Sequence, residues 1–143
     1  MVWALALFGG SALLAFARRR GPAAELALRR RLERPLAVEH AALVVALLAG
    51  LGSMALHGWG VGYPRWLAVK VGLTLFLVLP LEAMHAWVCH GWIARGLRET
   101  PEPPFSKDLA RGVGMDDMVR ALALPLLGLA LPLMAWLALA RPF

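Results

Sequence analysis

Long apolar runs alternate with shorter polar stretches along this chain. The apolar runs cover about residues 1–17, 37–57, 66–93 and 118–140. About 20 apolar residues cross the hydrocarbon core of a bilayer as a helix, which satisfies its own backbone hydrogen bonds there. The pattern therefore predicts an all-α, polytopic membrane protein, in which residues 1–143 form a single membrane domain with a four-transmembrane-helix bundle.

The polar stretches predict how the bundle is oriented. Residues 18–36 and 94–117 are rich in arginine, whereas the stretch before the third run contributes Arg65 and the C-terminus contributes Arg141. Basic residues concentrate in cytoplasmic connections. We therefore expect residues 18–36 and 94–117 to be the cytoplasmic connections, and both ends of the chain to lie outside, an N-out/C-out topology.

Aromatic residues support this orientation, because tryptophan and tyrosine gather at both membrane interfaces. Trp87 and Trp92 fall near the expected inner interface. The residues expected near the outer interface are Trp3, Trp59, Tyr63, Trp66 and Trp136.

The two cytoplasmic connections have different compositions. Residues 23–36 favour a helix, either a short amphipathic helix on the inner leaflet or an extension of the second span. Asp116 and Asp117 are expected at the start of the last helix, where carboxylates interact favourably with the helix dipole. Within residues 94–117, regular structure is expected to be broken by Pro101, Pro103, Pro104, Gly112 and Gly114.

Composition agrees with membrane residence, since 60% of the residues are hydrophobic and only 17% are charged. The net charge is +6, and most of the basic residues lie in the connections. This placement indicates that they set the membrane orientation and contact anionic lipid headgroups rather than bind nucleic acid. Cys89 is the single cysteine, so an internal disulfide is excluded. Residues 1–17 lack a basic segment before the apolar run, and we expect a retained first span rather than a signal peptide.

The third apolar run carries the candidate chemistry, namely Lys70, Glu82, His85, Cys89 and His90. Ionisable residues are costly inside a bilayer and usually face a partner, a cavity or a cofactor. Glu82, His85 and Cys89 share one helical face. His90 lies five residues after His85, about 140° around an α-helix, and is predicted to point elsewhere.

His40 lies near the cytoplasmic start of the second span, and the third span returns to the same leaflet. His40 and His85, or His90, are therefore expected to meet, an arrangement by which helix bundles hold haem iron. Glu82 is expected to orient the ring of His85. The alternatives are an interfacial pair of His40 with Glu39, and an interfacial position for His90.

Lys70 lies one turn into the third run from its outer end. Its side chain can extend to the outer interface, or it can hold an anionic group. A buried, neutral amine could instead bind metal or accept protons.

Several short motifs suggest a family. The third run begins with Trp66-Leu67-Ala68-Val69-Lys70 and continues to His85 and Cys89. Arg30-Arg31-Leu32 precedes the second run, and further similarities are Val2-Trp3 with Leu7-Phe8 and the ending Arg141-Pro142-Phe143. In this pattern the chain resembles the HemJ-type protoporphyrinogen oxidases, small bacterial membrane proteins related in pattern to the CopD-like group.

The resemblance implies a membrane redox protein of the bacterial cytoplasmic (inner) membrane, which oxidises protoporphyrinogen IX to protoporphyrin IX in haem biosynthesis. It implies haem b as cofactor and a membrane electron acceptor such as a quinone. Lys70 would hold haem or a substrate propionate, while His85, supported by Glu82, would ligate iron or move protons. His40 and His90 are the further haem-binding candidates.

The chain also departs from the family pattern. The family has a functionally required histidine early in its first span, and this sequence begins after that position. In the family this histidine and the lysine are thought to hold haem b, and only Lys70 carries over. His40 and His85 are therefore expected to replace the missing iron ligand.

Two other functions fit the sequence. One is a non-catalytic haem b or copper-handling protein of CopD-like pattern, although the six methionines are scattered rather than spaced as a copper motif. The other is a structural subunit of a homo-oligomer or larger membrane complex, in which the ionisable groups pair with a neighbour.

Overall fold

A computed structural model describes residues 2–56 and 64–140, with side chains from residue 8 onward. Some residues that support the expected orientation and the resemblance lie outside this part. They are the side chains of Val2, Trp3 and Leu7, together with Trp59, Tyr63 and Arg141-Pro142-Phe143.

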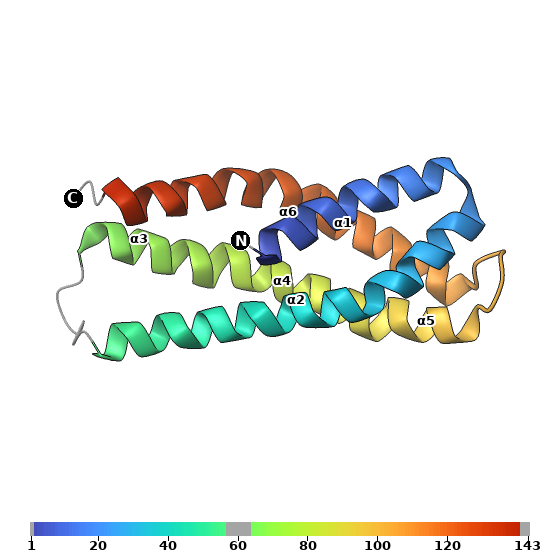
Figure 1. Cartoon of the computed structure of the whole chain (residues 1–143), viewed down its shortest axis with the longest axis horizontal. Helices are drawn as coiled ribbons and strands as arrows, with labels where there is room; N and C mark the ends of the chain where they lie inside the picture. Colours follow the sequence, from blue (N-terminus) through green and yellow to red (C-terminus); the bar gives the residue numbers. More distant parts are fainter. Residues whose placement is uncertain (1, 57–63, 141–143) are drawn as a thin grey trace.

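All secondary-structure elements of the described chain are helices. Its elements are α1 (Val2–Arg19), α2 (Pro22–Leu56), a continuous rod made of α3 (Arg65–Leu73), η1 (Thr74–Val78), α4 (Leu79–Trp87), η2 (Val88–Ile93) and α5 (Ala94–Glu99), and finally α6 (Lys107–Ala140). The rod, α2 and α6 run the length of the bundle, while α1 covers only the half where it joins α2 (Figure 1).

The first connection is mostly helix. α2 begins at Pro22, a favourable first helical position, and continues through Pro35 to Leu56, so the predicted extension of the second span is present. Only a tight turn separates α1 from α2. Gly21 has a φ of 110°, a conformation that glycine adopts without a steric penalty, and this reverses the chain.

The prediction that the last helix starts at Asp116 is wrong, because α6 begins at Lys107. The Ser106 hydroxyl accepts a hydrogen bond from the Leu109 backbone N–H at 3.2 Å and caps this earlier start. The predicted helix breaker Gly112 lies within α6, where a Cβ would come within 3.1 Å of the Trp92 Cβ. Close packing of α6 against the rod, rather than a turn, therefore explains this glycine.

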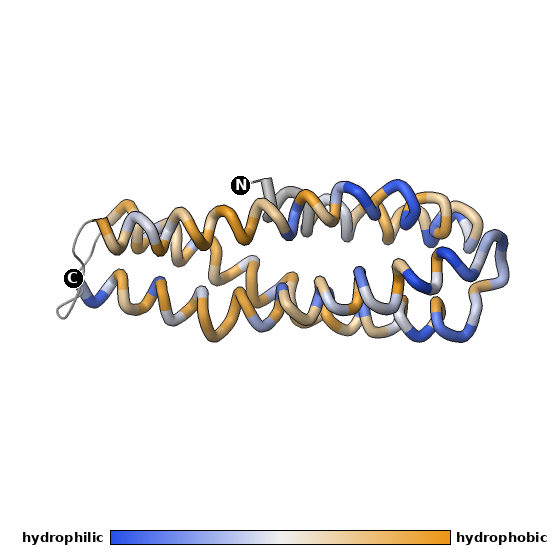
Figure 2. Tube along the Cα trace, turned by 90° about the horizontal axis from the view of Figure 1, so that it is seen from below, coloured by the Kyte–Doolittle hydropathy of each residue, from blue (hydrophilic) through white to orange (hydrophobic). Residues whose placement is uncertain are grey.

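Among the described residues, three helices are long and apolar enough to cross a membrane, which suggests a multi-pass membrane protein. They are Pro22–Leu56, Arg65–Glu99 and Lys107–Ala140. A helix of 35 residues is about 50 Å long, whereas the hydrocarbon core is about 30 Å thick. The hydrophilic residues gather at the end where α1 joins α2 and α5 joins α6, and this polar end extends beyond the apolar part (Figure 2).

The buried core is concentrated toward the polar end. Its largest cluster consists of Leu26, Val88, Cys89, Ile93, Leu97, Leu109 and Val119. In contrast, the apolar half of α2 is little covered by protein, since Val45, Leu48 and Leu51 are 65%, 63% and 61% exposed. Such a surface suits contact with lipid tails.

Candidate functional site

A π-helical segment of the rod carries Cys89 and His90. In η2 (Val88–Ile93) the backbone forms i→i+5 hydrogen bonds, such as that from the Ala94 N–H to the Cys89 carbonyl. His90 is exposed, whereas Glu82, His85 and Cys89 are buried, so His90 lies away from their shared face as predicted. Its ring nevertheless contacts His40. Single π turns are frequent at functional sites.

Three histidine rings meet between α2 and the rod. The ring centroid of His40 lies 5.4 Å from that of His85 and 5.0 Å from that of His90. His40 Nδ1 and His90 Nε2 are 3.1 Å apart and share a hydrogen bond. The expected approach of His40 to the histidines of the third span is thus present.

Two carboxylates complete this group. Glu82 Oε2 lies 3.8 Å from His40 Nε2, and Glu39 neighbours it closely enough for the two acidic side chains to repel each other. Glu39, Glu82 and His85 are 2%, 3% and 1% exposed. We name Glu39, His40, Glu82, His85 and His90 the imidazole–carboxylate cluster.

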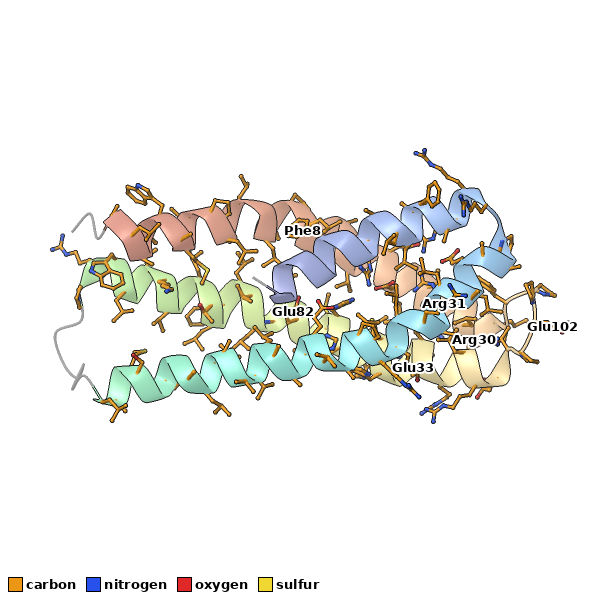
Figure 3. The ribbon with its side chains drawn as sticks, viewed as in Figure 1. Phe8, Arg30, Arg31, Glu33, Glu82 and Glu102 are labelled. Carbon is orange, nitrogen blue, oxygen red and sulfur yellow. The ribbon has the colours of Figure 1, made fainter. Side chains whose placement is uncertain are left out.

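The cluster lies inside the bundle, away from its charged end. Figure 3 shows Glu82 near the middle of the bundle, whereas the surface charges lie toward the polar end, as Arg30, Arg31, Glu33 and Glu102 do.

Several buried polar atoms of the cluster have no hydrogen-bond partner within the described part of the chain. They are His40 Nε2, His85 Nδ1 and Glu39 Oε1. On both rings the other nitrogen is occupied, by His90 on His40 and by Arg120 Nη2, at 3.0 Å, on His85. Most buried polar groups are satisfied, and those that are not often mark an ion or a catalytic role.

A second polar group adjoins the cluster on α6. Asp116 is 0% exposed and receives hydrogen bonds from Arg29 at 3.0 Å and from Arg120 at 2.9 Å. Arg120 also donates to the Ser11 hydroxyl of α1 at 2.6 Å. The Arg120 guanidinium thus links α1, α6 and His85.

This group continues to the polar end. Glu25 receives hydrogen bonds from Arg18 and Arg29, both at 2.9 Å, and Arg18 also donates to Asp117 at 2.6 Å. We name Arg18, Glu25, Arg29, Asp116, Asp117 and Arg120 the ion-pair network. Its three cations and three anions balance, and it ties α1, α2 and α6 together.

The sequence interpretation missed the ion-pair network. Glu25 with Arg29 and Asp116 with Arg120 stand at i,i+4 spacing, a signal of side chains on one helical face. Because residues 18–36 and 94–117 were interpreted as surface connections, their arginines were taken for topology signals, and Asp116 and Asp117 were assigned to the helix dipole. The contact of Arg29 with Asp116 joins residues 87 positions apart and has no local signal.

Among the residues that the structure describes, two groups of side chains have metal-ligating atoms within 4.8 Å of one another: His40 with Glu82 and His85, and His85 with Cys89 and Asp116. In the second group, both oxygens of Asp116 already bind guanidinium groups. The first group offers two imidazole nitrogens without hydrogen bonds. It is therefore the better candidate for a metal ion.

Lys70 does not join the cluster. It lies in α3, fifteen residues before His85, which corresponds to about 22 Å along a helix. Its backbone carbonyl accepts a hydrogen bond from the Thr74 hydroxyl at 2.9 Å. A single site that contains both Lys70 and His85 is excluded by this separation.

The histidines do not fit a haem in this arrangement. A porphyrin held by His40 and His85 would have to lie between rings whose centroids are 5.4 Å apart, and His90 contacts the same His40 ring. Within the described chain, a cavity of about 400 Å³ lies elsewhere, at the polar end; it is lined by Arg18, Pro22, Glu25, Pro103, Pro104 and Phe105.

Comparisons with protein-family models, with curated proteins and with solved structures give no match to this chain.

Proposed function

We propose that this membrane protein binds one first-row transition-metal ion through His40, Glu82 and His85, and that it is a metal-handling protein. The observation that carries the proposal is the pair of buried imidazole nitrogens without hydrogen bonds, His40 Nε2 and His85 Nδ1. They belong to two residues whose ligand atoms lie within 4.8 Å of one another and of a Glu82 oxygen. Two imidazoles and one carboxylate suit iron, copper, nickel or zinc.

His90 supports the proposal by fixing the tautomer of His40. Metal-binding histidines usually donate their second ring N–H to an acceptor, which orients the ring. If His40 Nδ1 donates to His90 Nε2 across their 3.1 Å contact, His40 Nε2 retains its lone pair. That lone pair then points toward Glu82, 3.8 Å away.

Charge supports a divalent cation. Glu39 and Glu82 are both buried and repel each other. Buried carboxylates normally pair with cations or coordinate metals. A divalent ion would neutralise both and remove their repulsion.

Three protein ligands leave coordination positions open. Closed, structural zinc sites use four protein ligands, whereas sites that exchange or activate a ligand use three. Within our proposal, the ion is therefore exchanged or used chemically, and it does not serve as a structural cross-link.

We also propose the orientation of the site. The arginine-rich ends of α1 and α2, and the α5–α6 connection, lie together at the polar end (Figure 2). By the positive-inside rule this end is cytoplasmic, with α1 as a fourth, shorter span and an N-out/C-out topology in a bacterial inner membrane. The metal site then lies at the cytoplasmic side of the apolar region.

A HemJ-like oxidase that uses haem b and a quinone-type acceptor is the second candidate. It rests on the resemblance and on the meeting of three imidazoles from two helices. It requires α2 to move away from the rod, and the high exposure of Leu48 and Leu51 on α2 favours such a movement.

Metal analysis and an absorption spectrum of the purified protein test both candidates. We expect about one transition-metal ion per chain and its loss in His40→Ala and His85→Ala. Cys89→Ser is the matched control, because Cys89 belongs only to the other possible ligand group. A Soret band would favour the haem oxidase. A colourless, metal-free protein would contradict both candidates and leave the structural subunit as the remaining function.

A further inference from the structure

His85 Nε2 has two competing neighbours on α6. Arg120 Nη2 lies 3.0 Å away and Asp116 Oδ1 lies 3.6 Å away. The two neighbours make opposite demands on the ring, because a guanidinium only donates hydrogen bonds and a carboxylate only accepts them.

These demands decide whether His85 can bind a cation. When Arg120 donates to Nε2, that nitrogen holds the lone pair and the ring proton is on Nδ1. When Nε2 donates its proton to Asp116, Nδ1 holds the lone pair. Since Nδ1 is the nitrogen without a hydrogen bond in the cluster, only the second tautomer can ligate a metal there.

We infer that Arg120 competes with the metal ion for His85. The hydrogen bond from Arg120 to Nε2 holds the ring in the non-ligating tautomer. Metal binding replaces this bond with one that Nε2 donates to Asp116. This inference rests on the proposed metal site. The ring loses the proton on Nδ1 and gains one on Nε2, so it exchanges no net proton with its surroundings. Arg120 is thus a positioning residue that acts on the ligand His85.

This exchange of hydrogen bonds requires only a small change in the contacts of Arg120. Its Nε stays bonded to Asp116 at 2.9 Å and its Nη1 to Ser11 at 2.6 Å, so only the Nη2 contact has to be released. Asp116 is already held by Arg29 and is a ready acceptor for the ring N–H. A carboxylate behind a metal-binding histidine is a common arrangement that strengthens the ligand.

Zinc affinity of an Arg120 variant tests the inference. We expect Arg120→Gln to bind Zn²⁺ about tenfold more tightly than the unaltered protein, which is at the lower end of effects from residues behind metal ligands. Arg29→Gln is the matched control, because it removes the same charge and another hydrogen bond to Asp116, but no contact with His85. Unchanged or weaker zinc binding by Arg120→Gln would overturn the inference.

The tautomer of His85 can be measured in the unaltered protein, independently of any variant's folding. ¹⁵N NMR of the imidazole nitrogens is expected to show the Nδ1–H form without metal and the Nε2–H form with Zn²⁺. An Nε2–H ring in the metal-free protein would overturn the role of Arg120. If the unaltered protein binds no Zn²⁺, the proposed function fails; if it binds Zn²⁺ and Arg120→Gln binds no tighter, this inference alone fails.

Discussion

The ion-pair network and the imidazole–carboxylate cluster are neighbours that differ in how completely their polar atoms are satisfied. In the network, Asp116 uses both of its carboxylate oxygens in hydrogen bonds to guanidinium groups. Arg29 Nη2 has no hydrogen bond but lies 2.9 Å from the Glu25 carboxylate, so its charge is paired. In the cluster, His40 Nε2, His85 Nδ1 and Glu39 Oε1 have no hydrogen bond. Each group has a buried part, Glu39, Glu82 and His85 in the cluster and Glu25, Arg29 and Asp116 in the network, so burial alone does not distinguish them.

This difference separates a structural role from a binding role. A buried ion pair with its hydrogen bonds complete resists the loss of either partner, because the remaining charge is left uncompensated. A group of converging imidazoles and carboxylates with unused atoms is destabilising until a cation arrives. The network therefore holds α1, α2 and α6 together, and the cluster offers a site between α2 and the rod.

Removal of Asp116 tests the structural role of the ion-pair network and should have the largest effect on stability. Asp116→Ala leaves Arg120 without its carboxylate and Arg29 with Glu25 alone, and we expect a loss of about 3–5 kcal/mol in the free energy of unfolding in detergent. Asp117→Ala is the control, because its pair with Arg18 is 42% and 35% exposed, and it should cost at most about 1 kcal/mol. Equal losses in the two variants would contradict a structural network.

Replacement of Glu82 should weaken metal binding without lowering stability, the opposite of what we expect for Asp116. Glu82→Gln keeps the shape of the side chain but removes a buried charge and a metal ligand. We expect metal affinity to fall by about a hundredfold, while the metal-free protein unfolds at the same or a higher temperature. Isothermal titration with Zn²⁺ and a thermal melt measure the two effects. A large loss of metal-free stability would place Glu82 with the structural network instead.

Replacement of His90 should show whether His90 orients His40 or binds the metal ion directly. His90→Phe keeps an aromatic ring but removes the partner of His40 Nδ1. We expect metal affinity to fall by about tenfold, because His40 loses its orientation but remains a ligand. A decrease as large as that of His40→Ala would instead make His90 a direct ligand.

Replacement of Lys70 should have the smallest effect. Lys70→Met changes a residue about 22 Å along the helix from His85, and we expect metal affinity to stay within about twofold of that of the unaltered protein. A loss of bound cofactor in this variant would favour the HemJ-like function, for which Lys70 is the best marker in the sequence.

Periodicity and composition were sufficient to predict the coarse fold. Long apolar runs predicted an all-α, multi-pass membrane protein, and three described helices are long and apolar enough to cross a membrane. The helix ends were not predictable in the same way. Gly112 was interpreted as a helix breaker because it lies in a stretch rich in proline and glycine. Its neighbour Trp92 is distant in sequence, so the close packing of α6 against the rod became visible only in three dimensions.

The candidate site was predicted in part. The antiparallel arrangement of two helices was enough to predict that His40 approaches the histidines of the third span, whereas the π turn of η2 has no simple sequence signal. Asp116 and Arg120 were missed because their importance comes from contacts with Arg29 and His85 on other helices. Long-range pairing of charges cannot be deduced from helical periodicity.

X-ray absorption spectroscopy of the metal-loaded protein tests the central claim most directly. With Zn²⁺ bound, we expect a first coordination shell of nitrogen and oxygen only, with the scattering pattern of two imidazoles at about 2.0–2.1 Å. Replacement of His40 should remove one imidazole from that pattern. A sulfur ligand at about 2.3 Å would assign the ion to Cys89, and a spectrum unchanged in His40→Ala would contradict a metal site between α2 and the rod.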